Sequence, residues 1–171
     1  MDTYMVVLRI VHILAGVFWV GAALTTLLFI QPTARELGPA AGPFMMHLAG
    51  RKRLIDFVLS AGGLTVLAGL LMYWRVSGGL EPDWIGSAPG VALTVGALCA
   101  IAALAIGGSI VRPTIKANLA IGREVAAGGG PPTPEQAAQL QVLQRRGTAA
   151  GKAIVPLLIV AVVMMAAARY L

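Results

Sequence analysis

Four long apolar stretches without a charged side chain constrain this chain more than any other feature of its sequence. They occupy residues 10–30, 57–74, 84–111 and 153–168. A helix that crosses a bilayer needs about 20 apolar residues, and uncharged neighbours extend the shorter last stretch toward that length. Because the bilayer offers the backbone no water, runs this long without two-residue alternation form helices. The sequence therefore predicts an all-α integral membrane four-helix bundle.

The four stretches predict a single transmembrane domain over residues 1–171. Thr133 as N-cap, Pro134 at the first helical position and Gln136 closing a capping box predict where the last helix begins. The expected helices cover about 4–31, 46–75, 88–121 and 135–170, with a loop at about 122–134.

The composition agrees with a membrane protein and excludes several other classes. Hydrophobic residues make up 58% of the chain and charged residues 12%, whereas soluble domains are about 45–50% apolar and about 25% charged. Disordered chains have the opposite bias. A single cysteine excludes an intrachain disulfide framework and any cysteine-rich zinc or iron–sulfur site.

The basic residues predict an orientation. Ten of the 13 lysines and arginines lie at the end of the bundle that carries the first and third interhelical connections, and three lie at the other end. Because cytoplasmic loops carry the excess of Lys and Arg, both termini are expected outside, in a bacterial-type inner membrane. The net charge of +6 is then a topology signal, and we expect no nucleic-acid partner.

A short internal similarity links the ends of the first and third predicted helices. Residues 29–35 and 110–116 each contain a Pro-Thr pair followed by a basic residue. The pairs are Pro32-Thr33 and Pro113-Thr114. This pattern predicts a parallel repeat of two hairpins about an axis along the membrane normal.

His12 is the main functional candidate, because ionisable groups inside a membrane span are costly and usually functional. Counting from Tyr4 at the outer boundary places it about 12 Å deep. Arg9, His12 and Trp19 share one helix face with small residues that allow close approach of another helix or a flat cofactor. Trp19 lies near mid-bilayer and is expected to pack inward.

Other residues counted to the depth of His12 have side chains that bind soft metals. They are Cys99 on the third helix and Met164 or Met165 on the fourth. Histidine, methionine and cysteine are ligands for haem iron or a soft copper ion. Arg9 lies one turn further out, where a haem propionate would emerge. A histidine that only bonds a neighbouring helix, with the other three residues as core or lipid-facing side chains, is the alternative.

His47 opens the second predicted helix at the inner face. His12 lies about 27 Å along the helix axis from Ile30, so the two histidines are not expected to share one iron within a single bundle. A second metal site or an interfacial histidine are both open interpretations of His47. No residue is assigned a catalytic role.

The segment Leu8–Gly21, with Arg9, His12 and Trp19-Val20-Gly21, resembles the opening helix of the copper-resistance D (CopD) domain and related small bacterial membrane families. HemJ-type protoporphyrinogen oxidases open in a similar way. The resemblance to HemJ implies haem b bound through His12. The resemblance to CopD implies copper handling instead.

The leading prediction is a b-type haem-binding redox protein with His12 as an axial ligand and a cofactor site that includes Arg9, Trp19, Met164 and Met165. The alternatives are a copper-handling protein using His12, Cys99 and the methionines, and a structural or assembly subunit without a cofactor. Since each chain holds one His12, a homodimer would let a second chain supply the sixth iron ligand. A quinone or a redox protein is the expected electron partner.

Overall fold

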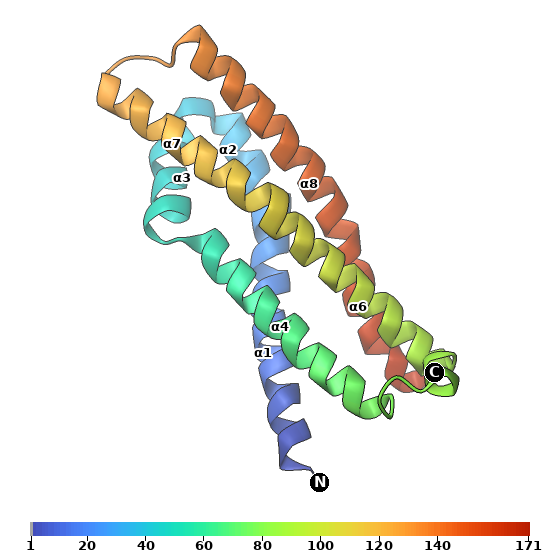
Figure 1. The fold of residues 1–171 in the computed structure, drawn as a ribbon. Helices are drawn as coiled ribbons and strands as arrows, with labels where there is room; N and C mark the ends of the chain where they lie inside the picture. The colour runs from blue at the N-terminus through green and yellow to red at the C-terminus, as the bar shows by residue number, and fades with distance from the viewer. Residues whose placement is uncertain (1) are drawn as a thin grey trace.

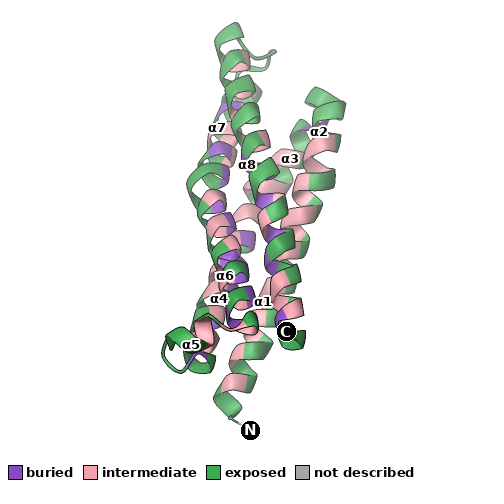
Figure 2. Ribbon diagram, turned by 90° about the vertical axis from the view of Figure 1, so that its right-hand side faces the viewer, coloured by how far each residue is buried: buried purple, intermediate pink, exposed green. Residues whose placement is uncertain are grey.

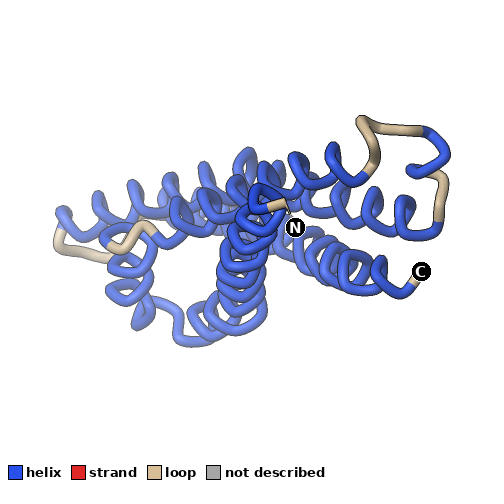
Figure 3. The backbone as a smooth tube through the Cα atoms, turned by 90° about the horizontal axis from the view of Figure 1, so that it is seen from below, coloured by secondary structure: helices blue, strands red, loops and turns tan. Residues whose placement is uncertain are grey.

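The computed structural model describes residues 2–171, which are helical apart from short connections (Figures 1 and 3). This finding confirms the predicted all-α membrane bundle, and the chain is a multi-pass membrane protein. The helical segments long and apolar enough to cross a membrane are Thr3–Arg51, Leu54–Val76, Ala88–Gly128 and Pro134–Tyr170.

These segments are divided into shorter elements by local changes in helix geometry. Turns of π-helix occur at η1 and η3 in the first segment and at η4 in the third, and η2 and η5 are short 3-10 helices. In chain order the elements are α1 (Thr3–Thr25), η1 (Thr26–Ile30), α2 (Gln31–Leu37), η2 (Gly38–Ala41), α3 (Gly42–Met45), η3 (Met46–Arg51), α4 (Leu54–Val76), α5 (Pro82–Ile85), α6 (Ala88–Ile106), η4 (Gly107–Val111), α7 (Arg112–Gly128), α8 (Pro134–Ala167) and η5 (Ala168–Tyr170).

The long helices form two pairs. Helix α1 packs mainly along α4, and α6 packs mainly along α8, with α4 and α6 joining the pairs. Both chain termini and α5 lie at one end of the molecule, which we call the termini end (Figures 1 and 2). Helices α2 and α3 and the connection between α7 and α8 lie at the opposite end, the turn end.

Burial follows the packed faces of the helices, and the outside of the bundle is apolar. Buried positions run along the middle of the bundle, whereas exposed and intermediate positions alternate along its outer faces (Figure 2). Leu158 is fully buried, while Leu14 and Val17 are 67% and 69% exposed. Large apolar side chains on the outside suit a lipid environment, because lipid tails solvate them.

Three helix boundaries differ from the predicted ones. The helix predicted to end near residue 31 continues through α2 to Leu37. The helix predicted to begin near residue 46 is divided, because Arg53 adopts a left-handed conformation with φ 52° and α4 starts only at Leu54. The loop predicted from residue 122 is helical up to Gly128, and Gly129 ends the helix with φ 66°. The predicted capping box of Thr133 and Gln136 is confirmed.

The two Pro-Thr pairs occupy equivalent local structures. A turn of π-helix precedes each pair, and its last backbone bond runs from Gln31 N–H to the Thr26 carbonyl and from Arg112 N–H to the Gly107 carbonyl. Proline lacks an N–H and its ring crowds the preceding turn of an α-helix. The wider π turn accommodates that ring at Pro32 and Pro113, so the two hairpins share a structural feature as well as a sequence pair.

Candidate functional site

His12 lies on α1, partly buried against α4. Its Nδ1 is 2.8 Å from the backbone carbonyl oxygen of Thr65. Because a carbonyl oxygen only accepts hydrogen bonds, Nδ1 carries the hydrogen and donates it. In the neutral ring this leaves the lone pair on Nε2, the nitrogen that can bind a metal or accept a proton.

Glycine on α4 makes room for the His12 ring. A Cβ atom at Gly69 would lie 2.9 Å from His12 Cε1 and 3.1 Å from Nδ1. Both separations are too short for non-bonded carbon and nitrogen atoms. The bare backbone of Gly69 is therefore what allows the imidazole to sit between the helices and reach the Thr65 carbonyl.

The same arrangement recurs at Trp19, seven residues further along α1. A Cβ at Gly62 would lie 2.7 Å from Trp19 Cε2, so this glycine also faces an aromatic ring. Between the two contacts the roles reverse, and Gly16 on α1 faces the Thr65 side chain. Rings and glycines thus interlock along the antiparallel pair, a variant of the small-residue contacts that hold membrane helices together.

Thr65 supports this contact without using its own hydroxyl group. The Thr65 Oγ1 donates to the carbonyl of Ala61, one turn earlier in α4, at 2.8 Å. The Thr65 side chain is buried, and its methyl group packs toward Gly16. The hydroxyl is thereby satisfied within its helix, and the Thr65 carbonyl is available to orient His12.

Trp19 and Arg9 lie on either side of His12 along α1. Trp19 is 4% exposed and belongs to the central core, which confirms that it packs inward. Arg9 lies one turn closer to the termini end and is exposed. The face predicted to combine Arg9, His12 and Trp19 therefore runs from the surface of the molecule to its core.

The sulfur-containing candidates belong to the other helix pair. Met165 on α8 packs over Gly96 on α6, and Cys99 lies partly buried one turn further along α6 as a free thiol. Met164 is partly buried beside Met165. Within residues 2–171, no three His, Cys, Asp or Glu side chains converge on a point where a metal ion could bind.

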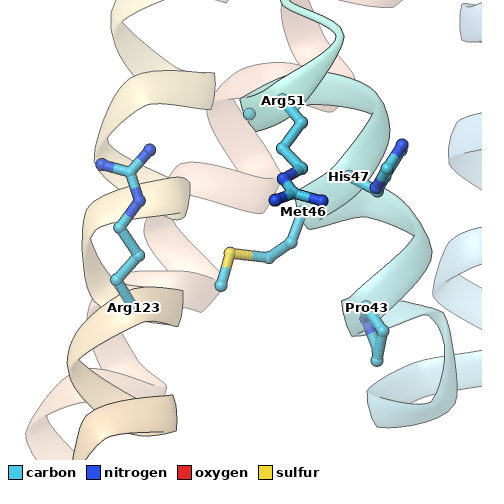
Figure 4. A pocket seen from close by; sticks show the side chains of 6 residues that line it. Pro43, Met46, His47, Arg51 and Arg123 are labelled. Carbon is cyan, nitrogen blue, oxygen red and sulfur yellow. The ribbon is translucent and has the colours of Figure 1, made fainter.

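His47 lies far from His12 along the fold, on η3 at the turn end. Its side chain is exposed and lines a surface pocket of about 370 Å³ together with Met46, Arg51 and Arg123. Figure 4 shows Met46 extending toward α7, which carries Arg123, while His47 points to the opposite side. The two histidines thus belong to opposite ends of the bundle.

Asp56 links two helices at the turn end. Its carboxylate accepts a hydrogen bond from Arg53 at 3.1 Å and one from Arg112 on α7 at 2.9 Å. The pair with Arg53 is local to the start of α4, whereas the pair with Arg112 crosses to the second hairpin. Asp56 is therefore an ion-pair residue and not part of the His12 site.

The contacts of the α4 residues with His12 and Trp19 were not predicted from the sequence. Thr65 contributes a backbone carbonyl, which any residue type provides, so its identity carries no signal. Gly62 and Gly69 do carry one, because they are seven residues apart, as are His12 and Trp19. Matching spacings on two antiparallel helices could have paired each ring with its glycine.

Comparison with known proteins gave no match: no family model, no curated protein and no solved structure is significantly similar to this chain. The resemblance of Leu8–Gly21 to the CopD and HemJ first helices accordingly stays a prediction.

Proposed function

We propose that this membrane protein binds b-type haem, with Nε2 of His12 as an axial ligand of the iron. The observation that carries the proposal is the hydrogen bond from His12 Nδ1 to the Thr65 carbonyl. Histidines that bind metals almost always donate their other ring nitrogen to a carbonyl or carboxylate, which fixes the tautomer and makes the ligand nitrogen more basic.

The residues around His12 fit such a group. Ala15, one turn along α1 from His12, is small and partly exposed, so it does not obstruct the approach of a flat macrocycle to the imidazole. Arg9, one turn nearer the termini end, is suited to pair with a propionate, because guanidinium groups bind carboxylates in a bidentate manner. Bound haem would supply one-electron redox chemistry, and the chain would bind it, orient it and shield it from water.

We also propose the setting in which this chemistry operates. The distribution of lysines and arginines favours a bacterial inner membrane with both termini outside. Met164 or Met165 of the other helix pair, or a histidine from another copy of the chain in a homodimer, would supply a second ligand. A membrane quinone or a redox protein is the expected electron partner.

The test is the absorption spectrum of protein purified from haem-replete cells, recorded with and without dithionite and combined with metal analysis. Wild-type protein should contain iron and porphyrin, and its Soret band should shift on reduction. His12→Ala should lose the band, and His47→Ala, the matched histidine variant at the other end, should keep it. Copper without porphyrin would favour the CopD-like alternative. A colourless protein in which His12→Ala changes only thermal stability would favour a structural role.

A further inference from the structure

The half of the bundle nearer the turn end contains a partly open cavity of about 550 Å³. Trp19 closes its deep end near the middle of the bundle, and Arg35 on α2 lies at the turn end. Binding pockets for small molecules typically measure about 300–1,000 Å³ and often form between the helices of a bundle. The cavity lies beyond Trp19 from His12, and the haem proposal does not use it.

All three π-helical turns face this cavity. Leu27 of η1, Leu48 of η3, and Gly107 and Val111 of η4 are part of its wall. A π turn widens a helix locally and frequently marks a functional site. The structural feature shared by the two hairpins is therefore located where the interior is hollow.

The wall of the cavity changes in character along its length. Near Trp19 it is formed by apolar residues such as Ala23, Val58 and Ile154. Toward the turn end, polar side chains enter the wall from three helices. They are Gln31 and Arg35 of α2, Thr114 and Asn118 of α7, and Gln144 of α8.

A basic groove adjoins the polar end of the cavity. Arg35 and Gln144 line both spaces, and Arg145 and Lys152 of α8 bring two further positive charges to the groove. Three cationic side chains at one opening would attract an anionic group, and guanidinium groups are well suited to phosphate and carboxylate.

We infer that the cavity binds a single-chain anionic amphiphile, an acyl or isoprenyl chain that ends in a carboxylate or a phosphate. The apolar chain lies in the cavity with its end near Trp19, and the anionic group lies in the groove between Arg35, Arg145 and Lys152. The separation of Trp19 and Arg35 by 16 residues of helix corresponds to about 24 Å, which suits a long extended chain. An apolar wall with a cationic opening is complementary to this class of molecule and not to a zwitterionic or neutral lipid.

The experiment uses photoreactive lipids that share one acyl chain, with a diazirine at its end, and differ only in headgroup. The purified protein, with whatever cofactor it carries, is labelled in uncharged detergent with the fatty acid, the lysophosphatidate or the zwitterionic lysophosphatidylcholine. The two anionic probes should label saturably, and the adducts should map to cavity residues near Trp19. The probe that half-saturates at the lower concentration identifies the headgroup as carboxylate or phosphate.

Three variants locate the headgroup and the chain. Arg35→Gln should raise the half-saturating concentration of the anionic probes about tenfold, the effect of losing one charge-assisted hydrogen bond. Lys116→Gln removes a charge at the same end of the molecule, outside the groove, and should leave labelling unchanged. Gly122→Leu should reduce labelling of the cavity, because Gly122 is part of the wall and a Cβ there comes no closer than 3.8 Å to Met46 Sδ, so a larger side chain has room to occupy part of the space.

Labelling that does not saturate would overturn the inference, and so would equally strong labelling by the zwitterionic probe. Either result would show that the probes contact only the lipid-facing surface of the protein. Equal effects of Arg35→Gln and Lys116→Gln would also overturn it. Arg35 is exposed, so this comparison remains decisive if Gly122→Leu fails to fold. His12→Ala should not change labelling, which separates the outcome from that of the haem proposal.

Discussion

The two helix pairs of this bundle achieve close packing by different means. In the α6–α8 pair, small residues bring the backbones together, and a Cβ at Gly96 would lie 3.3 Å from the Ala161 carbonyl oxygen. In the α1–α4 pair, the glycines Gly62 and Gly69 instead receive the rings of Trp19 and His12. In the α6–α8 pair, glycine lets the two helix backbones come close together. In the α1–α4 pair, the glycines make room for the rings of Trp19 and His12.

The difference in packing supports placing the proposed haem site in the α1–α4 pair. Small-residue contacts are a general way to hold membrane helices together, and the α6–α8 pair needs no further explanation. An imidazole inside a membrane span carries a desolvation cost, and here it also requires a glycine opposite the ring. A leucine in place of His12 would avoid the desolvation cost. The α1–α4 pair is therefore the pair in which we place the proposed ligand atom, His12 Nε2.

The largest expected effect on stability comes from removing the indole ring of Trp19. Trp19→Ala should lower the free energy of unfolding by about 3 kcal/mol, because the indole is buried and its loss leaves a cavity. Phe18→Ala, next in sequence but half exposed to lipid, should stay within about 0.5 kcal/mol of wild type. Equilibrium unfolding in mixed micelles measures both, and equal losses would contradict the central role of Trp19.

Adding one methyl group should distinguish the glycines of the two pairs. Gly62→Ala should destabilise by about 2 kcal/mol, because the new Cβ overlaps the rigid indole. Gly63→Ala meets no atom within 4 Å and should gain up to about 1 kcal/mol from helix propensity. Gly96→Ala should cost less than Gly62→Ala, because its Cβ would lie 3.0 Å from Met165 Cγ and 3.3 Å from the Ala161 carbonyl oxygen, whereas the Cβ at Gly62 would lie 2.7 Å from the indole. A larger loss of stability for Gly96→Ala than for Gly62→Ala in the same unfolding assay would contradict the proposed difference between the two pairs.

Loss of the hydrogen bond between His12 and the Thr65 carbonyl should lower the free energy of unfolding by a smaller amount. His12→Ala in protein from haem-starved cells should cost about 1 kcal/mol, the value of one interhelical hydrogen bond in a membrane. In protein from haem-replete cells the difference from wild type should grow, because a bound ligand stabilises only the form that binds it. The same difference in both preparations would indicate a purely structural histidine.

The smallest effect on stability is expected from the Asp56 ion pairs at the turn end. Asp56→Asn removes the ion pairs with Arg53 and Arg112 and should lower thermal stability less than His12→Ala does. The difference from wild type should shrink in about 1 M salt, where screening acts over about 3 Å. Asp83→Asn, an exposed carboxylate at the termini end, is the control. A salt-independent loss would show that Asp56 acts through packing.

Much of this architecture could be predicted from the sequence, because hydropathy and caps act locally. The four spans, the inward position of Trp19 and the capping box at Thr133 follow from such local signals. The break at Arg53 did not, because its left-handed conformation is set by how η3 meets α4. The partners of His12 and Trp19 depend on the register between two helices, which no single segment encodes.

The central claim is that His12 Nε2 binds haem iron, and chemical rescue tests it most directly. His12→Gly removes the ligand and leaves a space that imidazole from solution can enter. We predict that this variant is purified without a Soret band and regains one, with a shift on reduction, when haem and imidazole are added together but not when haem is added alone. A variant that retains bound haem without imidazole, or one that stays folded and never regains haem, would contradict the claim.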